Sequence, residues 1–121
     1  MQKVKIGVLI SGGGTNLQAI IDAIEKGYIN GEIVVVISDR EGAYGLERVR
    51  KHGIPGITIN RKDFKNKDEF FNTFIEKLEE YKVELVVLAG FLTILSYGFV
   101  ERFKDRIINV HPALIPAFCG D

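Results

Sequence analysis

Short runs of β-branched and other apolar residues alternate along this chain with longer segments whose apolar residues recur at helical spacing. The short runs are bounded by turn or capping residues and predict five strands, over Val4–Ile10, Ile33–Ser38, Ile57–Asn60, Leu85–Gly90 and Ile107–Val110. Their near-continuous apolar character is typical of parallel strands that are covered on both faces. The pattern therefore predicts a parallel sheet buried between layers of helices.

Segments between these strands have the apolar spacing of amphipathic helices: Asn16–Lys26, Tyr44–His52, Asp68–Tyr81 and Tyr97–Phe103. We expect Thr15 to be the N-cap of the first helix and Gly27 to end it. Strands and helices therefore alternate along the chain, which favours right-handed crossovers and helices on both faces of the sheet. The predicted fold class is α/β, an open twisted parallel sheet with five strands.

The unusual residues of the chain follow three of the predicted strands. The first strand leads into Ser11–Asn16, the fourth into Gly90–Ser96 and the fifth into Asn109–Pro112. In an open parallel sheet, ligands bind outside the carboxyl ends of the strands, near the point where the strand order reverses. We therefore expect these three loops to lie on one edge and to form one site.

Three consecutive glycines, Gly12 to Gly14, join the first strand to the first helix. Glycine lets the backbone approach a ligand closely, and the N–H groups of Gly14, Thr15 and Asn16 at the helix start can cradle a phosphate. The loop lacks the lysine of a P-loop, and Leu17 takes the place of the third glycine of a dinucleotide fingerprint. A tight turn without a ligand is the alternative, but two glycines suffice for a turn, so three favour an anion site.

The loop after the fifth strand carries the candidate chemistry. His111 has a side chain whose ordinary pKa, about 6.5, suits proton transfer near neutral pH. Asn109 precedes it by two residues and offers an amide donor on the same side of an extended backbone. Together they could protonate and polarise a carbonyl group, although a histidine before a proline at a strand end is often only structural.

The loop Gly90–Ser96 after the fourth strand is mostly apolar. Leu92, Ile94 and Leu95 could line a pocket for a flat ring whose edge bonds to main-chain groups, since such pockets are mostly hydrophobic. They could equally belong to the core, and the sequence does not decide between the two.

A structural role is favoured for several other polar residues. Asp39 could hold a ribose hydroxyl as in dinucleotide-binding folds, but we expect it to cap a local turn. His52 is expected on the surface at the carboxyl end of a short helix, and Cys119 is expected to be an inert thiol. Neither histidine has a Cys or carboxylate at ligand spacing, so we predict no metal site.

The composition narrows the classes of function further. The 16 Lys and Arg balance 16 Asp and Glu, so the chain lacks the positive charge of a dedicated nucleic-acid binder, although it could bind one small anion. Its single cysteine cannot form an internal disulfide, and no apolar run approaches the length of a membrane span. We therefore expect a cytoplasmic protein that is not a dedicated nucleic-acid binder.

Three of these segments together resemble phosphoribosylglycinamide formyltransferase, an enzyme of purine biosynthesis. They are Ser11–Ile21, Val87–Ser96 and Ile108–Pro116, and the resemblance extends in order over essentially the whole chain. It implies a Rossmann-like formyltransferase fold and transfer of a formyl group from 10-formyltetrahydrofolate, the co-substrate, to the amine of glycinamide ribonucleotide.

The resemblance also implies roles for individual residues. Its motifs assign the substrate phosphate to Gly14, Thr15 and Asn16, the folate to Lys67, Leu92, Thr93, Ile94, Leu95 and Asn109, and catalysis to Asn109 and His111. Many members have Arg at the position of Thr93 and at that of Lys67. Asn109 would stabilise the oxyanion that forms when the amine attacks the formyl carbon, and His111 would act as general acid and proton shuttle.

Members of the family are longer than this chain, so residues 1–121 resemble the amino-terminal, ribonucleotide-binding part, as one α/β domain that stops after the fifth strand. The family uses an aspartate further along to raise the pKa of the histidine, and Asp121 is not that residue. We expect the isolated chain to have little or no activity. Formyltetrahydrofolate hydrolase, methionyl-tRNA formyltransferase, a non-catalytic nucleotide-binding module and a dehydrogenase-like module are the alternatives. The Ser11–Asn16 loop favours the ribonucleotide enzyme over the tRNA enzyme, whereas the hydrolase shares a related loop and typically carries an extra regulatory domain ahead of it.

Overall fold

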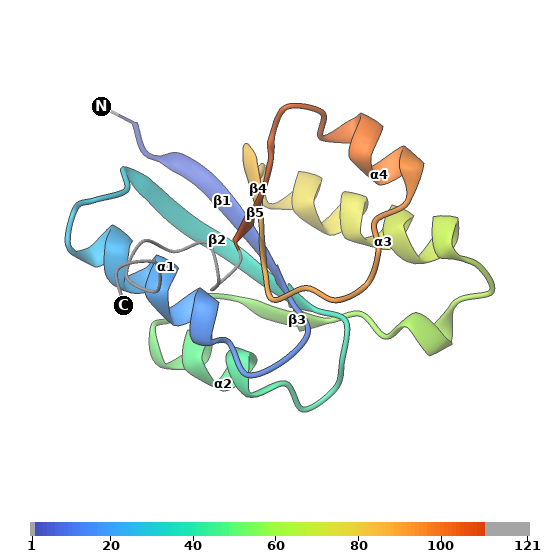
Figure 1. The fold of residues 1–121 in the computed structure, drawn as a ribbon, viewed down its shortest axis with the longest axis horizontal. Helices are drawn as coiled ribbons and strands as arrows, with labels where there is room; N and C mark the ends of the chain where they lie inside the picture. Colours follow the sequence, from blue (N-terminus) through green and yellow to red (C-terminus); the bar gives the residue numbers. More distant parts are fainter. Residues whose placement is uncertain (1, 111–121) are drawn as a thin grey trace, which may run out of the picture.

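The computed structural model describes residues 2–110, and a five-stranded sheet runs through its centre (Figure 1). The strands are β1 (Val4–Ile10), β2 (Gly31–Ser38), β3 (Gly56–Thr58), β4 (Leu85–Ala89) and β5 (Ile107–Val110). They lie in the order β3-β2-β1-β4-β5, and every neighbouring pair is parallel. The predicted α/β fold class is confirmed.

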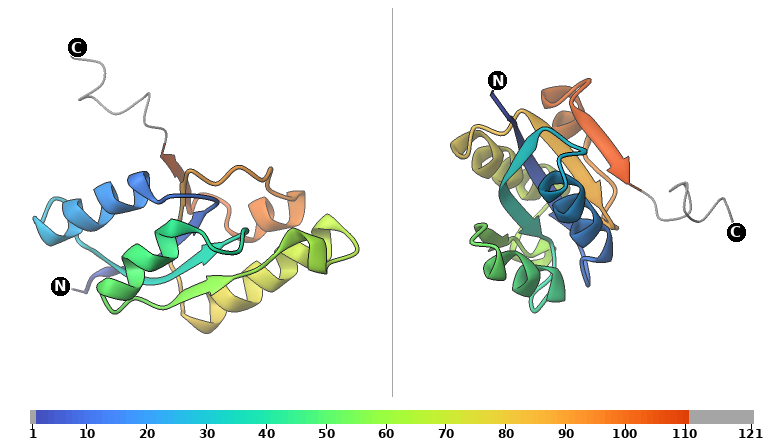
Figure 2. Two further views of the ribbon diagram at one scale, coloured as in Figure 1. Left: turned by 90° about the horizontal axis from the view of Figure 1, so that it is seen from below. Right: turned by 90° about the vertical axis from the view of Figure 1, so that its left-hand side faces the viewer.

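The helices within this range are α1 (Thr15–Glu25), α2 (Tyr44–Lys51), the short 3-10 helix η1 (Arg61–Asp63), α3 (Lys67–Glu80) and α4 (Tyr97–Arg102). Helices α1 and α2 cover one face of the sheet, and α3 and α4 cover the other (Figure 2). All the predicted strands and helices form, but β2 begins at Gly31, because this residue pairs with Val4 at the start of β1. Helix η1 was not predicted, and β3 ends at Thr58 before it.

Each face of the sheet has its own hydrophobic core. The core under α1 and α2 includes Leu17, Ile20, Ile21, Leu46 and Val49. The core under α3 and α4 is rich in phenylalanine: Phe70, Phe71, Phe74, Phe99 and Phe103 are all buried there. Successive residues of β1 point to opposite faces, as a pleated strand requires, so the sheet is held rigidly between two cores. Within residues 2–110, no helix has both the length and the apolar character of a membrane span.

The strand order reverses between β1 and β4, which are neighbours at the centre of the sheet. The chain moves outward from β1 through β2 to β3, and then crosses back to β4 on the other side of β1. At such a reversal the connections leave the two strands in opposite directions and open a crevice at their carboxyl ends. The loops after β1 and β4, both expected to bind ligand, flank this crevice.

Candidate active site at the carboxyl edge of the sheet

The glycine loop turns directly into α1. Gly14 is the N-cap residue, with φ of 82° and ψ of 23° in the left-handed region, and no side chain of residues 2–110 caps this helix end. The expectation that Thr15 is the N-cap is wrong, because the left-handed turn at Gly14 lets the helix begin one residue earlier, at Thr15 itself. The Gly14 carbonyl accepts the Gln18 N–H at 2.8 Å, so the Thr15 N–H, on the same peptide, points away from the helix.

Helix α2 holds the carbonyl groups of the other two glycines. The Gly45 N–H donates to the Gly12 carbonyl at 3.2 Å, and Arg48 Nε donates to the Gly13 carbonyl at 2.9 Å. Because the C=O and N–H of a trans peptide point in opposite directions, the N–H groups of Gly13 and Gly14 turn away from α2. These N–H groups have no backbone acceptor among residues 2–110, so the loop presents a row of donors to an anion.

The glycines of this region are required for different reasons. A Cβ on Gly14 would lie 2.7 Å from the Gly45 Cα, and a Cβ on Gly45 would lie 3.2 Å from the Gly12 carbonyl oxygen, so both glycines let α2 approach the loop closely. At Gly12 and Gly13, an added Cβ would meet no described atom within 4 Å, and neither has a left-handed φ. Sequence reasoning missed Gly45, although a glycine inside a predicted helix is a signal of close packing.

Asn16 connects the glycine loop to the far side of the crevice. Its Nδ2 donates to the carbonyl of Val110, the last residue of β5, at 3.5 Å. The same nitrogen would lie 3.8 Å from a Cβ on Gly90, the residue that follows β4. The start of α1 and the ends of β4 and β5 are therefore brought together, as the placement of three loops on one edge predicts.

The loop after β4 is tied to the ends of β1 and β2 from its inner side. The Leu92 N–H donates to the Oγ of buried Ser11 at 2.9 Å, and the Thr93 hydroxyl donates to the Asp39 carboxylate. The Leu92 and Ile94 side chains are 68% and 79% exposed, so they do not belong to the core. Leu95 is different, because it is half-buried against the core under α3 and α4.

Asp39 does not cap a local turn, so that prediction is wrong. Ser38 does so instead, because its Oγ accepts the Arg40 N–H at 3.1 Å and donates to the Arg40 carbonyl at 2.8 Å. Asp39 is buried, its Oδ2 accepts the Thr93 hydroxyl from across the sheet edge, and its Oδ1 has no hydrogen-bond partner within residues 2–110. The carboxylate therefore anchors the loop after β4 and is not presented to a ribose hydroxyl.

One of the two candidate catalytic residues lies within the described chain. Asn109 lies in β5 opposite Leu88 of β4 and is exposed. His111 lies outside the described residues, as does Cys119, so predictions about their placement stay predictions. Val110 is the residue before His111, and its carbonyl accepts a hydrogen bond from the Asn16 side-chain amide. This bond brings the described end of β5 to the start of α1.

Lys67, the remaining candidate, is the first residue of α3. The Asn66 side chain caps this helix by accepting the Glu69 N–H at 2.8 Å. One turn further, the ring of Phe71 lies 6.3 Å from that of Phe91, the residue before Leu92. The start of α3 is therefore close to the loop after β4.

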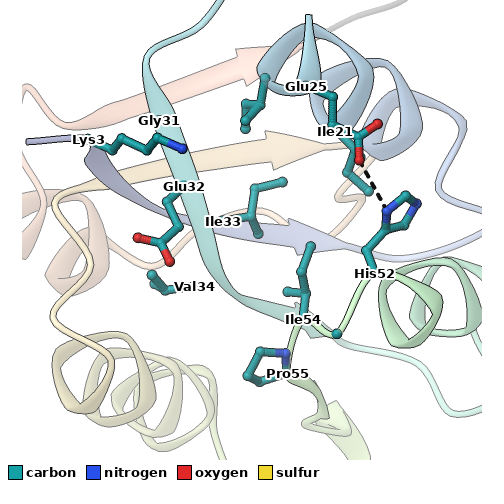
Figure 3. Close-up of a pocket in the computed structure, with 12 residues that line it drawn as sticks. Lys3, Ile21, Glu25, Gly31, Glu32, Ile33, Val34, His52, Ile54 and Pro55 are labelled. Carbon is teal, nitrogen blue, oxygen red and sulfur yellow. Dashed lines mark ion pairs between the residues drawn. The ribbon is translucent and has the colours of Figure 1, made fainter. Parts of the chain in front are cut away.

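A surface hollow of about 530 Å³ lies away from this edge, at the amino end of β2 (Figure 3). His52, which follows the last residue of α2 as expected, lies on its rim with Nδ1 3.4 Å from Glu25 Oε2. Among residues 2–110, none of the candidate site residues lines this hollow. Within residues 2–110, no three His, Cys, Asp or Glu side chains are grouped as a metal site requires.

Comparison with known proteins identifies close relatives. The family model described as formyl transferase matches residues 4–121. Phosphoribosylglycinamide formyltransferase of Haemophilus influenzae is 46% identical over 116 residues, which are 96% of this chain and 55% of that protein. The trifunctional purine biosynthetic protein adenosine-3 of Gallus gallus is 45% identical over 118 residues, 98% of this chain and 12% of that protein.

Solved structures agree with the sequence relatives. The crystal structure of glycinamide ribonucleotide transformylase 1 from Symbiobacterium toebii superposes with a TM-score of 0.87 at 45% identity, over 96% of this chain and 55% of that one. The chain thus spans about half the length of the single-function relatives that it matches.

Proposed function

Because the chain belongs to the formyl transferase family, we propose that it is the ribonucleotide-binding part of a phosphoribosylglycinamide formyltransferase. The proposed reaction transfers a formyl group from 10-formyltetrahydrofolate to the amine of glycinamide ribonucleotide, as a step of purine biosynthesis in the cytoplasm. The names of the relatives support the reaction, and the position of the crevice between β1 and β4 supports the location of the site.

The single observation that carries the proposal is the pair Gly12 and Gly13. Nothing within the described chain requires glycine at these positions, because a Cβ added to either residue would have no described atom within 4 Å and neither φ is left-handed. A ligand that must approach the backbone supplies the missing reason. We propose that this ligand is the phosphate of the ribonucleotide, held by the N–H groups of Gly14, Thr15 and Asn16 at the start of α1.

The folate is proposed to lie against the loop after β4. The exposed side chains of Leu92 and Ile94 offer an apolar surface, which a flat pterin ring can cover. In this proposal Thr93 and Leu95 contribute main-chain groups, and Lys67 offers a positive charge to the acidic part of the folate. Because Ser11 and Asp39 hold this loop from its inner side, its outer side remains available to the ring.

In the proposed mechanism, the amine nitrogen of the ribonucleotide attacks the formyl carbon. Its new C–N bond makes a tetrahedral intermediate, whose oxyanion accepts a hydrogen bond from the Asn109 amide. His111 takes the proton that the amine loses and gives it to N10 of the folate as the bond from the formyl carbon to N10 breaks. The products are formylglycinamide ribonucleotide and tetrahydrofolate, and no atom or electron is left over.

The catalytic part of the proposal is tested by His111→Ala in the complete gene product. The absorbance of the folate product reports the rate, and we expect a loss of about 100-fold or more. His52→Ala is the matched control, because this second histidine lies on the rim of the hollow away from the proposed site. A His111→Ala protein that keeps the wild-type rate would show that the histidine is not catalytic.

The phosphate-binding part is tested independently by calorimetry of this chain with glycinamide ribonucleotide. Gly13→Val adds bulk where the ligand is expected and where the protein leaves room, so we expect weaker binding by about tenfold, or about 1.4 kcal/mol, with the melting temperature unchanged. Equal affinity of wild type and variant would refute the glycine loop as the phosphate site.

A further inference from the structure

Arg48 of α2 has an environment unlike that of a solvated surface arginine. Its Nε donates to the Gly13 carbonyl at 2.9 Å, and its Nη1 lies 3.3 Å from Gln18 Oε1 of α1. Its guanidinium carbon lies 5.2 Å from the centre of the Tyr44 ring, which adds a cation–π contact. The side chain is half-buried and bonded to two elements, so its planar group is held in one orientation.

Gln18 completes the support for the guanidinium. While its Oε1 accepts from Arg48, its Nε2 donates to Asp22 Oδ1 at 3.0 Å, one turn further along α1. The amide is thereby oriented with its oxygen toward the arginine. A series of hydrogen bonds therefore connects the body of α1 to the glycine loop, from Asp22 through Gln18 and Arg48 to the Gly13 carbonyl.

Arg48 donates its hydrogen bond to the peptide group of the loop that can rotate most easily. The peptide between Gly13 and Gly14 is flanked by two residues without a Cβ, so it can turn over at little steric cost. Turned over, it would point its carbonyl oxygen, in place of the Gly14 N–H, at a bound anion. A charge-assisted hydrogen bond to that carbonyl opposes the rotation.

We propose that Arg48 is a positioning residue of the phosphate site, because it holds the Gly13 carbonyl and so keeps the Gly14 N–H directed at the anion. This inference rests on the proposed function. The arginine acts from behind the loop: it bonds to the carbonyl side of the peptide, whereas the phosphate binds on the N–H side. Its positive charge also strengthens the field of the donors in front of it.

The test is calorimetry of this chain with ribose 5-phosphate and with ribose. Arg48→Met keeps the length and apolar stem of the side chain but removes the donors. We expect its affinity for ribose 5-phosphate to fall by about tenfold, equivalent to about 1.4 kcal/mol. Arg48→Lys keeps one charged donor and should recover part of the loss. Arg50→Met is the matched control, because Arg50 lies on the same helix, 60% exposed and paired within the described chain with Glu47 at 3.4 Å.

Relaxation of the backbone amides distinguishes positioning from general loss of structure. In Arg48→Met without ligand, the amide ¹⁵N order parameter of Gly14 should fall while those of β1 stay unchanged. Should Arg48→Met not fold, Arg48→Gln is measured in its place. Wild-type affinity and an unchanged Gly14 amide in the folded variant would overturn the inference alone. No binding of ribose 5-phosphate by the wild-type chain would overturn the proposed phosphate site and, with it, this inference.

Discussion

Gly14→Ala tests how tightly the glycine loop and α2 are packed together. The new Cβ would lie 2.7 Å from the Gly45 Cα, a backbone atom that no side-chain rotation can move, and 3.2 Å from the Arg48 Cδ. A left-handed φ of 82° costs a non-glycine residue about 1–2 kcal/mol. Overpacking a close contact adds about 1–3 kcal/mol. We therefore expect the free energy of unfolding to fall by about 2–5 kcal/mol, a large share of the stability of one domain.

Urea denaturation, followed by circular dichroism, measures this change. Gly13→Ala is the matched control, because its Cβ enters open space at a φ that alanine adopts, so its stability should stay within about 0.5 kcal/mol of wild type. The melting temperature of Gly14→Ala should fall by about 10 °C or more, and that of Gly13→Ala should hardly move. Equal stability of the two variants would refute the close approach of α2 to the loop.

Three further substitutions test other contacts. Thr93→Val removes the hydroxyl that donates a hydrogen bond to the buried Asp39 carboxylate. We therefore expect the free energy of unfolding, measured by urea denaturation, to fall by about 1–3 kcal/mol. Thr93→Ser keeps the hydroxyl and should retain most of the stability. A loss of stability in Thr93→Ser as large as that in Thr93→Val would contradict the role of the hydrogen bond to Asp39. Asn16→Ala removes the side-chain donor to the Val110 carbonyl but keeps the backbone N–H that is proposed to bind the phosphate. We therefore expect a loss of about 1 kcal/mol in urea denaturation, with ribonucleotide affinity by calorimetry within about twofold of wild type. Phe71→Ala leaves a cavity among four neighbouring rings and should cost about 3–5 kcal/mol in thermal denaturation, whereas Phe64→Ala, at a half-buried ring, should cost less.

Most of the fold could be predicted from the sequence because local patterns determine it. Continuous apolar runs identify parallel strands, and the apolar face of each helix meets one of the two cores. Apart from the unpredicted helix η1, the errors lie at the ends of elements. The start of β2 depends on pairing with Val4 in β1, and the start of α1 depends on the backbone conformation of Gly14. Pairing and dihedral angles are not visible in a pattern of apolar residues.

The candidate site, like the fold, could be predicted from the sequence only in part. The glycine loop is one continuous motif, so its role as an anion cradle could be argued from its composition and its position after a strand. The residues that hold it, Gly45 and Arg48, belong to the next helix, and neither is adjacent to the loop in the sequence. Asp39 and Thr93 are likewise 54 residues apart, so their bond could not be read from either segment.

The sequence by itself determined the class of fold, the family and the three loops that carry the candidate chemistry, because each is encoded in a short continuous segment. Only the tertiary structure decided which groups hold those loops in place. It decided that Asp39 is an anchor and not a cap, that Leu92 and Ile94 face solvent, and that Arg48 binds the back of the glycine loop. The physical reason is that a hydrogen bond depends on distance and direction in space, and these arise only when strands and helices far apart in the chain pack together.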